Sequence, residues 1–175
     1  MSERVVLLTG GNLGDVAGAL EEARRQIARE VGPVVAASAV MESAAWGFES
    51  DDRFLNQGLV SETELAPHAV LERTQRIERR LGRIRPAPGH AMPEQAPRYG
   101  SRTMDIDILF YGSRVIAEPD LTIPHPLIAA RGFVLRPLAQ VLPALRHPQT
   151  GLTPGEMLAR LAQTQENDEK TTNNE

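Results

Sequence analysis

Two aspartates, Asp105 and Asp107, lie two positions apart in a run that otherwise has the composition of a buried β-strand. Side chains alternate between the faces of a strand, so both carboxylates are expected to point the same way. Their neighbours Met104, Ile106 and Ile108 are then expected to point into a core. Like charges on one strand face repel each other, and carboxylate oxygens are ligands that Mg²⁺ prefers. The pair therefore predicts a metal site, although an incidental pair on an exposed strand face explains so short a pattern equally well.

Arginines lie on both sides of a long proline-rich segment that precedes this pair. Residues 82–101 contain four prolines, and a loop of this length inside a compact domain is usually functional, disordered or lid-like. Phosphoryl transfer needs metal-binding carboxylates and several cations that hold phosphate, and guanidinium groups bind phosphate oxygens in pairs. The candidate phosphate-binding arginines are Arg83, Arg85, Arg98, Arg102 and Arg131. A mobile segment carrying some of them is expected to close over a bound triphosphate and exclude water.

A histidine and two phenylalanines are further candidates. His125 is held in an extended segment by a proline on each side, and although a lone histidine is more often structural, its nearness to Arg131 favours a functional interpretation. Phe54 and Phe133 are either core residues or the two sides of a stacking slot for a flat heterocycle. Asn56 offers the paired donor and acceptor that a pterin or purine edge requires. Composition and spacing alone rank the core interpretation first.

The periodicity of apolar residues predicts the elements that position these groups. The expected strands are residues 4–8, 34–43, 54–62, the run that holds the aspartates, and 115–116, followed by an extended stretch at 121–126. The expected helices are residues 17–31, 67–81, 127–130 and 133–141, with Asp15 as the N-cap of the first. This order, β-α-β-β-α-β, is that of a ferredoxin-like α+β sandwich with an antiparallel sheet, here with a C-terminal helical extension.

The bulk composition indicates one globular domain. The chain has 175 residues, of which 41% are hydrophobic, and the domain is expected to span residues 1–162. Residues 163–175 are polar and charged and are expected to form a disordered tail. The net charge of −4 favours no nucleic-acid partner, and no apolar run reaches the roughly 20 residues that span a bilayer. With no cysteine and no targeting segment, we expect a cytoplasmic monomer that binds neither nucleic acid nor membrane.

Taken together, the motifs resemble those of one enzyme family. They are Gly10–Gly14, Phe54–Asn56, Thr74–Glu78, Gly82-Arg83, Arg98–Leu109, and Pro124–Pro126 followed by Arg131–Phe133. In this order they resemble the 6-hydroxymethyl-7,8-dihydropterin pyrophosphokinases of folate biosynthesis over roughly residues 5–143, and the block Arg102–Leu109 is the most specific. The resemblance implies a ferredoxin-like α+β enzyme that moves the β,γ-diphosphate of ATP to the pterin hydroxymethyl group and releases AMP.

The resemblance also implies roles for individual residues. Asp105 and Asp107 would bind two Mg²⁺ ions that bridge the co-substrate ATP and the pterin hydroxyl, and Arg83 and Arg102 would clamp the phosphates. The implied ATP contacts are Gln75, Glu78, Arg85, Tyr99, His125 and Arg131. The implied pterin contacts are Gly10, Ser43, Trp46, Phe54, Asn56 and Phe133, with the two phenylalanines stacked on the ring.

The chain departs from the family pattern at several positions, among them Gly11, the pair Ala44-Ala45 and Pro126, and the segment between Arg85 and Tyr99 is longer than usual. No role is therefore carried over to residues 86–97. Two alternatives remain at this point. Another Mg²⁺-dependent phosphoryl or nucleotidyl transferase would share the aspartates and arginines without the aromatic slot, and a non-enzymatic ferredoxin-like module would use the arginine cluster at residues 73–85 for binding.

Overall fold

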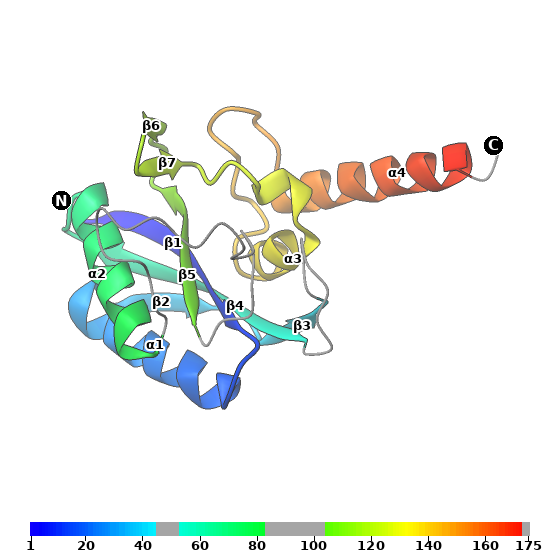
Figure 1. Ribbon diagram of the computed structural model, residues 1–175. Helices are drawn as coiled ribbons and strands as arrows, with labels where there is room; N and C mark the ends of the chain where they lie inside the picture. Colours follow the sequence, from blue (N-terminus) through cyan, green and yellow to red (C-terminus); the bar gives the residue numbers. More distant parts are fainter. Residues whose placement is uncertain (45–52, 83–103, 173–175) are drawn as a thin grey trace.

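The computed structural model describes residues 1–44, 53–82 and 104–172. In these residues the main sheet has five strands, and every pairing in it is antiparallel. The strands are β1 (Glu3–Gly11), β2 (Val34–Ala37), β3 (Met41–Ser43), β4 (Phe54–Thr63) and β5 (Asp105–Tyr111). Their order is β2-β4-β1-β5, with β3 also paired to β4. Helix α1 (Val16–Glu30) follows β1 and helix α2 (Pro67–Arg80) follows β4, so the predicted ferredoxin-like α+β fold is confirmed (Figure 1).

Helices cover both faces of this sheet, which makes it the middle of three layers (Figure 1). Val5 and Leu7 of β1 pack in the core cluster formed with α1 and α2. Val6 and Leu8 pack in a second cluster with α3 (Gly132–Val141) and α4 (Pro154–Thr172). A strand that is buried on both faces reads as a continuous apolar run, which is what residues 5–8 show. A binding site on this sheet must therefore lie toward one of its ends.

The two helices beside the sheet form where their periodicity predicts them. The side chain of Asp15 caps α1 by accepting a hydrogen bond from the backbone N–H of Gly18 at 3.1 Å. Leu20 and Ile27, two helical turns apart, are buried against the sheet. Helix α2 begins at Pro67, where the missing N–H of proline costs no intrahelical hydrogen bond.

The strand expected over residues 34–43 is instead two strands, β2 and β3. The pairing with β4 is interrupted at Ser38, whose backbone N–H donates to Gly58 O at 2.8 Å while its hydroxyl accepts from Gly58 N at 2.9 Å. The next N–H, on Ala39, leaves the sheet and donates to the Gln140 side chain of α3. The side chains of Ser38 and Gln140 thus take the places of backbone acceptors. These contacts between distant residues split the strand.

The chain after β5 forms a hairpin and then helices. Strands β6 (Ile116–Glu118) and β7 (Leu121–Ile123) pair with each other, where only a short strand and an extended stretch were expected. A cis peptide bond joins Ile123 to Pro124, and the 3₁₀ helix η1 (Ile128–Ala130) leads into α3. These short helices lie where the sequence predicts them.

The prediction of a disordered tail from residue 163 is wrong as far as Thr172, because α4 continues to that residue. Met157 and Leu161 pack this helix on the core, and the exposed residues that follow include Gln163, Glu166 and Lys170, all good helix formers. Extending an existing helix needs no new nucleation, so a polar segment can stay helical. In Figure 1 α4 projects from the body of the molecule.

No helix in residues 1–44, 53–82 and 104–172 is long and apolar enough to cross a membrane.

Candidate active site

The register of the main sheet brings residues from four strands into one row. Gly10 of β1 pairs with Asn56 of β4 on one side and with Asp105 of β5 on the other, and Asn56 pairs with Met41 of β3. One step further along, Leu8 pairs with Asp107. Paired residues in a sheet share a face, so Gly10, Asn56 and both aspartates lie on the face that α3 and α4 cover.

The two aspartates lie as the alternation predicts. Met104, Ile106 and Ile108 are buried in the core on the opposite face, and both aspartates are half-buried. The carboxylates therefore share one face, at the point where strand β5 begins. Two adjacent, partly solvated carboxylates are a donor set that suits a hard divalent cation.

Asn56 is held against the backbone of β1. It is 5% exposed, and its side-chain Nδ2 donates a hydrogen bond to the hydroxyl of Ser43 at 2.9 Å. A Cβ added at Gly10 would lie 2.4 Å from Asn56 Oδ1 and 3.1 Å from Leu55 O. Only glycine leaves room for the amide at this position. Ser43, Gly10 and Asn56, all predicted pterin contacts, are thus in one cluster, and half-buried Phe54 lies two residues from Asn56 on the same strand face.

His125 and Arg131 form the other side of the candidate site. Burial lowers the pKa of His125 to about 4, the guanidinium of Arg131 acts in the same direction, and the carboxylate of Asp105 partly opposes both. These electrostatic effects mean that the imidazole of His125, the guanidinium of Arg131 and the carboxylate of Asp105 are near neighbours. The backbone N–H of His125 donates to Leu109 O of β5 at 3.0 Å, which fixes the histidine beside the strand of the aspartates. Its Nδ1 accepts from the backbone N–H of Leu127 at 3.2 Å, so in the neutral ring the proton is on Nε2.

Arg131 and Phe133 are adjacent at the start of α3. The guanidinium of Arg131, which is 8% exposed as a residue, lies 5.5 Å from the centroid of the Phe133 ring. This is the distance of a cation–π contact, which fixes the arginine and the half-buried ring relative to each other. The charged and aromatic candidates therefore meet at one end of α3.

Two predicted ATP contacts, Gln75 and Glu78, come from a different layer. They lie in the last turns of α2, which packs against the edge strand β5 on the face opposite to the aspartate side chains. Gln75 is half-buried and Glu78 is 1% exposed. Helix α2 and the aspartate side chains thus lie on opposite faces of the sheet, and the roles of Gln75 and Glu78 as ATP contacts stay predictions.

Six predicted site residues fall outside the described part of the chain. These are Trp46, Arg83, Arg85, Arg98, Tyr99 and Arg102. The flanking residues Gly82 and Met104 follow α2 and precede β5. Their roles as phosphate, ATP and pterin contacts stay predictions.

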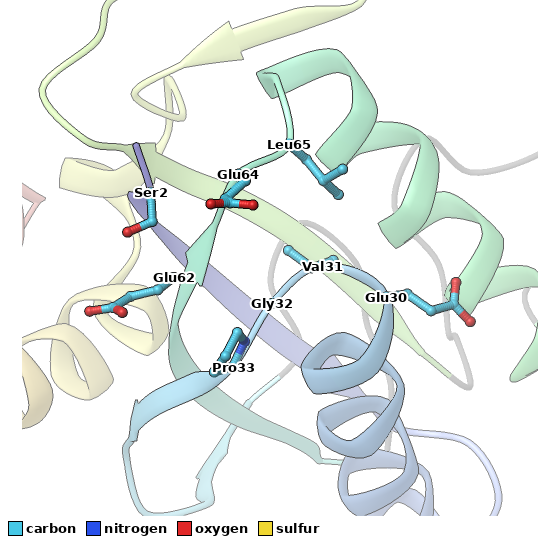
Figure 2. A pocket seen from close by; sticks show the side chains of 8 residues that line it. All are labelled: Ser2, Glu30, Val31, Gly32, Pro33, Glu62, Glu64 and Leu65. Atoms are coloured by element: carbon cyan, nitrogen blue, oxygen red, sulfur yellow. The ribbon is translucent and has the colours of Figure 1, made fainter.

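A pocket of about 410 Å³ lies at the other end of the sheet (Figure 2). Its lining residues are Ser2, Glu30, Val31, Gly32, Pro33, Glu62, Glu64 and Leu65. None of the predicted site residues is among them. Three glutamates disfavour a phosphate ligand, so this pocket is not the candidate for nucleotide binding.

Comparison with known proteins identifies the family. The model of the 7,8-dihydro-6-hydroxymethylpterin-pyrophosphokinase family matches residues 6–143. Several bacterial proteins named 2-amino-4-hydroxy-6-hydroxymethyldihydropteridine pyrophosphokinase are similar to this chain. The relative from Methylorubrum extorquens is 38% identical over 143 residues, covering 81% of this chain and 84% of its own length. The relative from Porphyromonas gingivalis is 38% identical over 146 residues, covering 83% of this chain and 94% of its own length. For Aquifex aeolicus the identity is 34% over 144 residues, covering 82% and 83%.

The fold is also similar to that of a solved structure, the wild-type HPPK-DHPS of Plasmodium falciparum with pteroate. The TM-score is 0.73 at 14% sequence identity, over 91% of this chain and 44% of the other. The chain thus spans less than half of that longer protein, and at this identity the likeness concerns the fold alone. The family match and the bacterial relatives together show that this chain belongs to the 7,8-dihydro-6-hydroxymethylpterin-pyrophosphokinase family and is an ATP-dependent pyrophosphokinase.

Proposed function

We propose that the protein transfers the β,γ-diphosphate of ATP to the hydroxymethyl group of 6-hydroxymethyl-7,8-dihydropterin. The hydroxyl oxygen forms a bond to the β-phosphorus, the bond from that phosphorus to the α,β-bridging oxygen breaks, and AMP leaves. The hydroxyl proton is released to solvent in the same reaction. The observation that supports this most is the row Asn56–Gly10–Asp105, which puts the Asn56 amide two strands away from the Asp105 carboxylate on one sheet face. In this proposal the amide reads the heterocycle and the carboxylate binds the metal.

The pterin would bind at the Asn56 end of this row. Phe54 and Phe133 would stack on its two faces, and Asn56 would read its edge, with Gly10, Ser43 and Trp46 lining the slot. Because Ser43 holds one N–H of the Asn56 amide and Gly10 gives it room, the amide is oriented before the substrate binds. Such preorganisation lowers the entropy that binding costs.

The triphosphate would bind at the aspartate end. Two Mg²⁺ ions on Asp105 and Asp107, when bound, would neutralise phosphate charge and the charge that develops on the transferred group. Arg83, Arg102 and Arg131 would hold the phosphates, and Gln75, Glu78, Arg85, Tyr99 and His125 would contact the nucleotide. Neutral His125 is suited to donate a hydrogen bond from Nε2, because its Nδ1 is already an acceptor.

A product assay tests this proposal. Purified protein is incubated with ATP, Mg²⁺ and 6-hydroxymethyl-7,8-dihydropterin, and the nucleotides are separated by chromatography. The expected result is one AMP formed for each pterin diphosphate, with neither product in the absence of pterin. Pterin-dependent formation of ADP would instead indicate transfer of a single phosphoryl group, and the proposal would be wrong.

The substitution Gly10→Ala should weaken pterin binding with little effect on ATP. Its methyl group would lie 2.4 Å from Asn56 Oδ1, so the amide has to move out of its bonded position. We expect KM for the pterin to rise about tenfold, the equivalent of one hydrogen bond of about 1.4 kcal/mol, while KM for ATP is unchanged. Gly155→Ala is the matched control, because a Cβ there meets nothing within 4 Å. Combining Gly10→Ala with Asn56→Ala should add little to the effect of Asn56→Ala alone, since both act through one amide.

A further inference from the structure

Three side chains that the sequence analysis did not single out meet at the end of the molecule opposite to the aspartate row. His68 is in the first turn of α2, Glu118 ends β6, and Asp120 lies in the turn between β6 and β7. Figure 1 shows the β6–β7 hairpin at the same end of the molecule as the beginning of α2. Glu118 and Asp120 lie 50 and 52 positions after His68 in the sequence, so only the fold brings the three residues together.

One ring nitrogen of His68 lies beside two carboxylates. Nε2 is 2.9 Å from Glu118 Oε2 and 3.2 Å from Asp120 Oδ1. A ring nitrogen carries at most one hydrogen, so it cannot donate along both directions at full strength. The three atoms are also mutually close, since all lie within 4.8 Å of one another.

The two contacts of His68 have the spacing of ligands around a single metal ion. Ligand bonds of about 2.0–2.2 Å place neighbouring ligand atoms roughly 3.0–3.5 Å apart in tetrahedral or octahedral geometry. The 3.2 Å contact of His68 falls within that range, and the 2.9 Å contact falls just below it. An ion between the three atoms would contact all of them, which a single N–H cannot do.

The donor set indicates the chemical class of the ion. Imidazole nitrogen with two carboxylates favours Zn²⁺ and its transition-metal neighbours over Mg²⁺ or Ca²⁺, which prefer oxygen alone. Two carboxylates also balance the charge of a divalent cation. The side chains are 46%, 53% and 64% exposed for His68, Glu118 and Asp120, so an ion can enter from solvent and water can complete its coordination.

We propose that His68, Glu118 and Asp120 form a surface site for a divalent transition-metal ion of the Zn²⁺ class, which joins the β6–β7 hairpin to the start of α2. A two-stranded hairpin is only marginally stable by itself, so a metal link would restrain it. The competing explanation is an ion pair alone, in which the carboxylates accompany His68 near the positive end of α2, whose N-cap makes no side-chain hydrogen bond.

The Zn²⁺ titration that separates these explanations begins with a chain in which Asp105 and Asp107 are both replaced by asparagine. That background removes the proposed Mg²⁺ ligands, so its result does not depend on the proposed function. Calorimetric titration with ZnCl₂ should show one saturable step, and the same chain should gain thermal stability with Zn²⁺. Adding His68→Gln should remove both effects, and adding Glu118→Gln should weaken binding at least about tenfold, since even indirect support of a metal ligand is worth about 10–100-fold.

His147→Gln and Glu64→Gln are matched controls, and both should keep the Zn²⁺ step. Circular dichroism of each variant checks that it folds. The proposal is overturned if the background chain shows no saturable step, or if the step has the same affinity with and without His68. Equal losses in the His68→Gln and His147→Gln variants would also overturn it, because binding would then not be specific to this cluster.

Discussion

Asp107→Asn should lower kcat of the pyrophosphokinase reaction by at least about a thousandfold while the protein stays folded. Asparagine keeps the shape of the side chain and removes its charge, so the proposed metal site loses one of its two carboxylates. Asp107 is half-buried and its neighbours Ile106 and Ile108 alone enter the core, so the unfolding free energy should change by less than about 1 kcal/mol. Steady-state kinetics with ATP and the pterin, and a denaturant titration, measure the two quantities.

A double substitution sharpens this expectation. If Asp105 and Asp107 hold the same ions, the chain with both replaced by asparagine should be little slower than either single variant, because groups that act as one unit are not additive. Asp168→Asn, on the projecting part of α4, is the control and should keep full activity. More than about a tenth of the normal kcat in Asp107→Asn would mean that the aspartate has no essential catalytic role, and a lost folding transition would mean that its role is structural.

Local patterns predicted the main elements of the fold because each element repeats one simple signal. The spacing of Leu20 and Ile27 marks the buried side of α1, and the alternation around Asp105 marks the two faces of β5. From the order of these elements a ferredoxin-like sheet followed directly. The break between β2 and β3 could not be predicted in this way, because it depends on a hydrogen bond from Gly58 to Ser38, 20 residues apart.

The candidate site shows the same limit. The aspartate pair and His125 are visible as local motifs, but the contact between Asn56 and Gly10 depends on strand order and register. The resemblance implied only that both residues contact the pterin. The helix α4 was missed for another reason. The polar composition of residues 163–175 predicted disorder, whereas the helix is held by the packing of Met157 and Leu161 on the core. His68 and its carboxylates have no local signal at all. Contacts between distant segments are thus what sequence patterns left out.

The stability of the protein without metal or nucleotide should fall as the pH drops from 6.5 toward 4, in large part because of His125. Burial first, and then the Arg131 guanidinium, lower the pKa of this imidazole from 6.5 to about 4 in the folded chain. In that pH window the unfolded chain binds a proton that the folded chain does not, so low pH favours unfolding. The full contribution is present above pH 6.5. We expect the unfolding free energy to be about 1–2 kcal/mol lower at pH 5 than at pH 8 from this group, after allowance for its partial solvent access.

Urea titrations at several pH values in the presence of EDTA measure this dependence. His125→Asn should flatten the profile between pH 4 and 6.5, because the group that titrates differently in the two states is gone. His147 is the comparison: burial also lowers the pKa of this half-buried histidine, but less strongly than that of His125, so His147→Asn should remove a smaller part of the slope. Carboxylates that do not interact with either histidine contribute equally to all three proteins and cancel in the comparison. An unchanged slope in His125→Asn would show that the imidazole is not desolvated in the folded protein, and the description of His125 as a neutral donor to the nucleotide would then be wrong.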